Sequence, residues 1–243
     1  MNILTKKIDY PVGDSTHQAY LAYDESVTTP VPGIVIVHEW WGLNDYMMRR
    51  AHMLAELGYV ALALDMYGDG QIARDSDQAG TLMNGVLDNM QQGTEALQAG
   101  YRLLLDQLRV DNSRTAAVGY CFGGAMVLHM ARIGLPLRAV VSFHGALGSF
   151  HSAAPGSIQP KMLVCHGEAD SMVTMDDVAA YKDEMNAAQA DYEVLLLAQA
   201  KHGFTSPQAD INAEKFDIDL GYQEQADEAS WAAMQKLFDE VFT

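Results

Sequence analysis

Short apolar runs alternate along this chain with longer stretches in which apolar residues recur at helical spacing. Continuous apolar runs of this kind are typical of strands buried on both faces of a parallel sheet. They occupy residues 33–39, 59–64, 115–119, 138–143, 161–165 and 192–197. The helical stretches between them cover about 44–57, 93–108, 123–133, 175–188 and 223–241. The alternation predicts an α/β fold, a doubly wound and mostly parallel sheet with helices on both faces and right-handed crossovers.

Two segments lie outside this alternation. The stretches 3–10 and 17–24 flank a Pro-Val-Gly-Asp turn signal, which predicts an antiparallel hairpin at one edge of the sheet. Residues 66–92 are rich in Gly, Asp and Gln, and the pattern leaves open whether they form a helix or a flap over a site. Because the chain contains no internal repeat and no low-complexity linker, we expect a single domain that covers residues 1–243.

The chain is strongly acidic, with 32 Asp and Glu against 15 Lys and Arg and a formal net charge of −17. Such a charge repels phosphate backbones and anionic lipid surfaces, so we expect neither nucleic acid nor a membrane as a partner. The N-terminus resembles no signal peptide, and Cys121 and Cys165 are too few for a disulfide framework. We therefore expect a cytoplasmic protein with reduced thiols. No His/Cys cluster has zinc spacing, and we expect no cofactor.

The clearest chemical motif follows the apolar run at 115–119. There Gly119-Tyr120-Cys121-Phe122-Gly123 leads into a helical stretch, a G-x-C-x-G nucleophile-elbow pattern with Cys in the place of Ser. Flanking glycines suit an elbow because strand and helix backbones approach closely there. Partial positive charge at the helix N-terminus would favour a thiolate at Cys121. Alternatively, Cys121 is a small buried residue in a Gly-rich turn, because short motifs often match by chance.

The ends of two later strands supply an acid and a histidine. Asp170 follows the run at 161–165, and His202 follows the run at 192–197. The order of nucleophile, acid and histidine is that of α/β-hydrolase triads, and carboxyl ends of parallel strands meet at one rim. His202 would exchange the proton of Cys121 while Asp170 fixes the tautomer of His202. Glu168 is the competing candidate for the acid of the triad. Alternatively, Asp170 or His202 taken alone is an ordinary loop residue.

An early strand end contributes a further carboxylate and two tryptophans. Glu39 would be poorly solvated beside Trp40 and Trp41, so it could accept or share the thiol proton of Cys121. The backbone N–H groups of Trp40 and Phe122 are the candidates for an oxyanion hole. The alternative for Glu39 is a surface position or an ion pair with a neighbouring arginine of the 44–57 stretch.

Four residues could line a substrate pocket, although aromatic side chains are as often part of a core. These candidates are Trp41, Tyr120, His144 and Arg74. Cys165, by contrast, lies inside an apolar run and is expected to be a buried core thiol.

The motifs together resemble those of the dienelactone hydrolase family of α/β hydrolases. The resemblance runs from Gly33-Ile-Val-Ile-Val-His-Glu39 through Val118-Gly-Tyr-Cys-Phe-Gly-Gly124 to His166-Gly-Glu-Ala-Asp170 and Lys201-His-Gly-Phe204. It implies an α/β-hydrolase fold and hydrolysis of an ester or enol-lactone by a Cys121-Asp170-His202 triad, with Glu39 as the resting partner of the thiol. One departure is the stretch after His202, which lacks the arginine that family members use to bind the carboxylate of anionic dienelactone.

The chemistry of a thiol nucleophile favours activated substrates. Thiolate leaves more readily than alkoxide, so the intermediate from a simple alkyl ester tends to revert, whereas enol and aryl leaving groups depart. We therefore expect a hydrolase that cleaves a small activated ester or lactone through an acyl-thioester on Cys121. The alternatives are a thiol peptidase or carbohydrate esterase on the same scaffold, and a non-catalytic binding protein. The sequence leaves open whether the chain is a monomer or a dimer.

Overall fold

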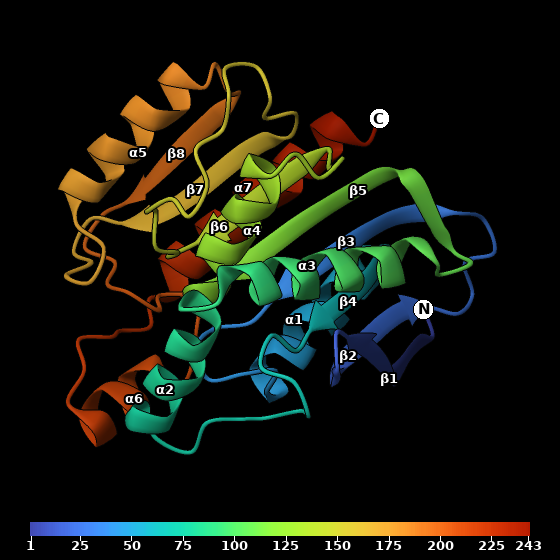
Figure 1. Ribbon diagram of the computed structural model, residues 1–243, viewed down its shortest axis with the longest axis horizontal. Coiled ribbons are helices and arrows are strands. Elements are labelled where there is room, and N and C mark those ends of the chain that lie inside the picture. The colour runs from blue at the N-terminus through green and yellow to red at the C-terminus, as the bar shows by residue number, and fades with distance from the viewer. The chain divides into compact units, whose positions relative to one another are not determined.

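The computed structural model describes residues 1–243, which divide into two compact units, Met1–Val118 and Gly119–Thr243. The boundary between the units falls within one strand, β5 (Val110–Tyr120). In all, the chain contains eight strands and seven helices (Figure 1). None of the helices is both long enough and apolar enough to cross a bilayer.

The first unit contains strands in the order β1-β2-β4-β3-β5. Its other elements are β1 (Ile3–Val12), β2 (Ser15–Asp24), β3 (Val31–Val37), α1 (Asp45–Glu56), β4 (Val60–Leu64), α2 (Ser76–Leu87) and α3 (Met90–Leu105). β3 and β4 are parallel, whereas β2 is antiparallel to β4 and to β1. The predicted N-terminal hairpin is thus confirmed, with β1 as the outer strand. β4 is buried along its whole length, as its continuous apolar run predicts.

The segment 66–92, which the sequence left open, is largely helical. α2 begins at Ser76 because the side chain of Asp75 accepts a hydrogen bond from the backbone N–H of Gln78, and Asn89 caps α3 in the same way. A Cβ at Gly100 of α3 would collide with the side chain of Leu64, so the missing side chain lets α3 lie close to β4.

The second unit holds the last three strands, in the order β6-β7-β8, all parallel. Its elements are α4 (Phe122–Arg132), β6 (Ala139–Phe143), β7 (Lys161–Gly167), α5 (Met175–Ala187), β8 (Tyr192–Leu197), α6 (Ala209–Phe216) and α7 (Glu224–Val241). α4 and α7 pack on β6 from opposite sides (Figure 1). Every residue of α4 is buried, and apart from His129 and Arg132 in its last turn its sequence contains no charged or strongly polar residue.

The α/β architecture with a mostly parallel sheet, predicted from the sequence, is confirmed. Two differences have simple causes. β5 starts at Val110 rather than 115, because residues 111–114 are polar and at least partly exposed and so interrupt the apolar signal. The short helix α6 was not predicted, because only Ala209 among its residues is buried and it has no apolar stripe.

Candidate active site

Cys121 stands at a sharp turn between β5 and α4. Its φ of +53° lies in the left-handed region, which a non-glycine residue adopts only when the surroundings enforce it. The backbone N–H of Cys121 donates to the carbonyl of Phe143 at 3.0 Å, so the end of β5 is tied to the end of β6. The half-exposed thiol therefore stands at the carboxyl ends of two strands, directly before the N-terminus of α4.

The neighbouring glycines make this turn possible. A Cβ at Gly119 would collide with the carbonyl oxygen of Gly123, and a Cβ at Gly124 would lie 2.7 Å from the Cα of Gly145. Both contacts are too short for any side chain, so strand and helix can approach only with glycine at these positions. For Gly119, the first glycine of the G-x-C-x-G pattern, the close approach of strand and helix that the sequence suggested is thus present in the folded chain.

The structure brings Cys121, Asp170 and His202 together within the second unit. Nε2 of His202 lies 3.1 Å from Sγ of Cys121, and Nδ1 of His202 lies 2.8 Å from Oδ2 of Asp170. His202 and Asp170 are buried, whereas Cys121 keeps partial exposure. The three side chains thus form a continuous hydrogen-bonded chain from a buried carboxylate to an accessible sulfur.

Both carboxylate oxygens of Asp170 accept hydrogen bonds. Oδ1 accepts the backbone N–H groups of Met172 and Val173, each at 2.9 Å, while Oδ2 accepts Nδ1–H of His202. Glu168, the competing acid in the sequence, is exposed and makes no contact of this kind. The structure therefore sets Asp170, and not Glu168, against the histidine.

Charge keeps the two buried groups ionised. Burial alone favours neutral Asp170, but hydrogen bonding and attraction to His202, with the two backbone N–H groups, lower the pKa of the carboxyl below its usual range. Burial would likewise lower the pKa of His202, yet the negative charge of Cys121 and the hydrogen bond to Asp170 raise it well above the usual imidazole value. The environment therefore stabilises the imidazolium form of His202 beside the carboxylate of Asp170.

His144 packs against the catalytic candidate His202. Their rings meet edge to face with centroids 5.3 Å apart, and Nε2 of His144 lies 2.7 Å from Oγ1 of Thr205. Both His144 and Thr205 are fully buried, and the φ of His144 is +40°. The sequence named His144 as a pocket candidate but missed Thr205, since a threonine three residues after a histidine belongs to no motif.

The remaining candidates lie in the core or in the first unit. Tyr120 is fully buried and stacks on Phe143 with ring centroids 4.8 Å apart. Glu39 is buried directly after β3, and the rings of Trp40 and Trp41 meet edge to face at 5.0 Å. The carbonyl of Trp40 accepts a hydrogen bond from the hydroxyl of Tyr67 at 2.9 Å. What these residues do for Cys121 stays a prediction.

Two charged side chains bear on the substrate question. Lys201, next to His202, is exposed and pairs with Asp219 at 2.6 Å. Arg74 is exposed just before α2. No group of three or more His, Cys, Asp or Glu side chains is arranged to hold a metal ion.

We expect iodoacetamide at neutral pH to label Cys121 and to leave Cys165 unmodified. Cys165 is fully buried in β7, where burial, helped by the charge of Glu193, raises the pKa of its thiol far above the usual value. Limited alkylation followed by peptide mapping measures both sites at once. Preferential labelling of Cys165 with full retention of activity would rule out Cys121 as the nucleophile.

Comparison with known proteins gives a consistent result along nearly the whole chain. A profile described as "Dienelactone hydrolase family" matches residues 17–242. A crystal structure of a dienelactone hydrolase-like promiscuous phosphotriesterase from metagenomic libraries is 37% identical, covers 100% of both chains and superposes with a TM-score of 0.91.

More distant relatives extend this result. A Yersinia pestis protein named "Putative carboxymethylenebutenolidase" is 23% identical over 77% of this chain and 74% of its own. A protein of Aquifex pyrophilus, named "Protein usf", is 25% identical over 87% of this chain and 89% of its own. The name of the Yersinia pestis protein is that of a lactone hydrolase.

Proposed function

The chain belongs to the dienelactone hydrolase family of ester and lactone hydrolases, and from this premise we propose that it cleaves small activated esters or enol-lactones through an acyl-thioester on Cys121. The observation that carries the proposal is the unbroken contact from Asp170 through His202 to Cys121 at a strained turn. We also propose that residues 1–243 act as one catalytic domain, because the family match runs across both units. A cytoplasmic location stays a prediction.

The proposed first half-reaction forms the thioester. Sγ of Cys121 attacks the acyl carbon, and the electron pair of the carbonyl moves onto its oxygen. That oxyanion is stabilised by the backbone N–H of Phe122, in the first turn of α4, and by the N–H of Trp40. When the carbonyl re-forms, the bond to the leaving oxygen breaks and Nε2–H of His202 protonates the departing group. The acyl group then stays on sulfur.

The second half-reaction returns the enzyme to its starting state. His202 is now neutral and takes a proton from water, whose oxygen attacks the thioester carbon. Sulfur leaves as a thiolate, which the imidazolium at 3.1 Å stabilises. Asp170 keeps Nδ1 of His202 protonated throughout, so that only Nε2 exchanges protons with the reacting atoms.

A panel of esters tests this assignment. The panel pairs one acyl group with aryl, enol and alkyl leaving groups, and includes the matched amide. We expect turnover of the aryl and enol esters by the wild-type enzyme, much slower turnover of the alkyl ester, and none by Cys121→Ala. Equal rates for the amide and the aryl ester would favour a thiol peptidase instead.

An uncharged aryl phosphotriester is a second candidate substrate. The support is the likeness to the promiscuous phosphotriesterase, which is 37% identical and matches over the full chain. Attack of Sγ on phosphorus would release the phenolate and leave a phosphorylated thiol. Stoichiometric release of phenolate by the wild-type enzyme, absent from Cys121→Ala, is the result that supports this activity.

We expect Glu39→Gln to leave a folded, active enzyme whose pH–rate profile is changed. Glu39 is proposed to share the thiol proton, and an amide can neither take up nor release a proton. The measurement is kcat/KM against pH for the wild type, Glu39→Gln and Glu56→Gln, the last being a control at an exposed carboxylate of α1. An inactive Glu39→Gln together with a nearly unaffected Asp170→Asn would require that the two roles be exchanged.

Neutral esters are expected to react with a higher kcat/KM than matched anionic ones. A substrate carboxylate loses hydration on binding, and the approach to a protein of charge −17 is unfavourable without a local cation. Lys201 is already paired with Asp219, and residues 203–206 contain no cation.

The test compares a neutral and a carboxylated enol ester with leaving groups of similar pKa, at two salt concentrations. Arg74 is the candidate cation, so Arg74→Ala is measured alongside. A preference for the anionic ester that disappears in Arg74→Ala contradicts the expectation and indicates a dienelactone-like substrate.

A further inference from the structure

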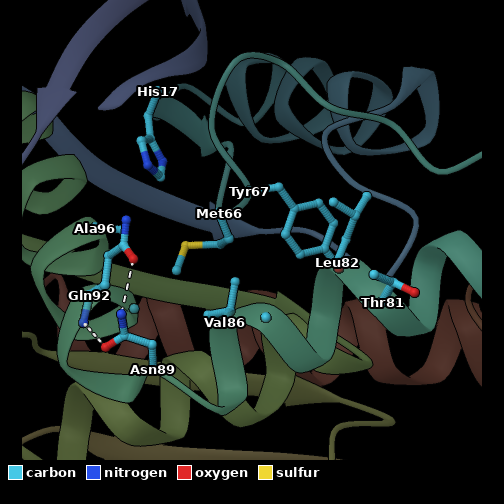
Figure 2. Close-up of a pocket in the computed structure, with 11 residues that line it drawn as sticks. His17, Met66, Tyr67, Thr81, Leu82, Val86, Asn89, Gln92 and Ala96 are labelled. Atoms are coloured by element: carbon cyan, nitrogen blue, oxygen red, sulfur yellow. Dashed lines mark hydrogen bonds between the residues drawn. The ribbon is translucent and has the colours of Figure 1, made fainter. Parts of the chain in front are cut away.

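A cavity of about 200 Å³ lies within the first unit, between β2, the segment after β4 and the helices α2 and α3 (Figure 2). Its lining contains no Asp, Glu, Lys or Arg. A charged ligand would find no opposite charge there, so the cavity, which is open to solvent on the side of Asn89 and Gln92, suits an uncharged molecule. The cavity volume exceeds the roughly 150 Å³ of an enclosed apolar cavity that holds one benzene ring, so a small aromatic compound fits in size.

One buried imidazole gives the cavity a hydrogen-bond acceptor. His17 is only 3% exposed, and its Nδ1 lies 2.8 Å from the backbone carbonyl of Asp65. Because a carbonyl can only accept, Nδ1 carries a proton, and in the tautomer with no proton on Nε2 that nitrogen presents a lone pair. In Figure 2 the ring points into the cavity. Its Nε2 can accept a hydrogen bond from a hydroxyl group.

An amide pair at the start of α3 supplies the complementary donor. Nδ2 of Asn89 donates to Oε1 of Gln92 at 3.1 Å, at the solvent-exposed side of the cavity. Nε2 of Gln92 then points away from Asn89 (Figure 2), and its one hydrogen bond, to Oγ of Ser15, is long at 3.5 Å. An amide nitrogen carries two protons, so Gln92 can also donate to a ligand oxygen.

The other walls of the cavity are mainly apolar, with Met66, Leu82, Val86 and Ala96 among them. We propose that this cavity is a binding site for a small uncharged phenol, whose hydroxyl donates to Nε2 of His17 and accepts from Nε2 of Gln92. The aromatic ring packs between Met66 and Val86. Apolar side chains and polar groups line this cavity together, and convergent polar groups of this kind orient ligands in small-molecule sites.

Two glycines of α2 provide a matched pair of variants. Gly85 lines the cavity and Gly80 does not, and a Cβ added at either position meets no atom within 4 Å. Both therefore accept a side chain without backbone strain, and leucine is a better helix former than glycine. Gly85→Leu fills the cavity, while Gly80→Leu makes the same change on the same helix outside it.

Phenol is the probe, and binding is measured by calorimetric titration, which needs no turnover. We expect phenol to bind the wild type and Gly80→Leu equally, and Gly85→Leu more weakly by about tenfold or more. Equal binding to both leucine variants, or no binding to the wild type, overturns the proposal.

Toluene has the same ring as phenol and no hydroxyl, so it tests whether His17 accepts a hydrogen bond from the phenol hydroxyl. His17→Asn keeps an N–H near the position of Nδ1 and has no counterpart of Nε2. We expect this variant to weaken phenol binding and to leave toluene binding unchanged. If both probes weaken equally, or if neither does, the assignment of the hydroxyl to His17 is wrong.

Discussion

Cys121→Ala is expected to reduce kcat for an aryl ester by a factor on the order of 10⁶, as loss of the nucleophile does in other triad hydrolases. The sulfur stands 3.1 Å from Nε2 of His202 and belongs to the one residue of the Asp170–His202–Cys121 chain that is partly exposed to substrate. Without it no acyl-enzyme forms, and the remaining groups can only orient water. The measurement is steady-state hydrolysis of the aryl ester by the purified variant.

Cys165→Ala is the matched control for this change. Its thiol is fully buried in β7 and has no route to substrate, so we expect kcat close to that of the wild type. A Cys121→Ala variant with substantial residual turnover, or a Cys165→Ala variant that is folded but inactive, contradicts the assignment of the nucleophile.

Asp170→Asn is expected to reduce kcat by about 10⁴-fold, as in the Ser-His-Asp triad. The carboxylate accepts Nδ1–H of His202 at 2.8 Å, whereas the amide N–H of an asparagine would face Nδ1 and favour the wrong tautomer. Asparagine can keep the hydrogen bonds from Met172 and Val173, so the turn should stay folded. The loss therefore reports on His202 and not on the fold.

The pH dependence distinguishes this explanation from a general loss of structure. Asp170 is one of the groups that raise the pKa of His202, so in Asp170→Asn the imidazolium should lose its proton at lower pH. We expect the alkaline limb of the residual activity to move to lower pH. Glu168→Gln removes an exposed carboxylate two residues away and should leave both rate and profile unchanged. An unshifted limb in Asp170→Asn would contradict the role given to Asp170.

Much of this architecture could be predicted from the sequence, because burial on both faces leaves continuous apolar runs. β4 and β6 are examples, and the glycines around Cys121 mark a turn in which any side chain would collide. The proximity of Cys121 and His202 was predictable too, since both follow parallel strands, and parallel strands place their carboxyl ends at one edge.

Other parts left no signal of this kind. The contact between His144 and Thr205 depends on a φ of +40° at His144 and on a turn after His202, and neither is encoded in residue spacing. The position of Asp170, closer to the turn towards the next helix, favours it over Glu168, but the hydrogen bonds from the backbone N–H groups of Met172 and Val173 that hold it are not visible in a pattern of side chains. Hydrophobic periodicity reports burial, whereas these features depend on local backbone direction.

The most direct test of the central claim is to trap the acyl-enzyme. An aryl ester with a slowly hydrolysed acyl group is mixed with wild type and Cys165→Ala, quenched in acid, and analysed by intact mass and peptide mapping. The thioester mechanism predicts that both proteins gain one acyl mass on the peptide that contains Cys121, and that Cys121→Ala gains none. The mechanism is contradicted if the wild type turns over the ester but carries no adduct on Cys121 at any quench time. It is also contradicted if a kinetically competent acyl adduct forms on another residue.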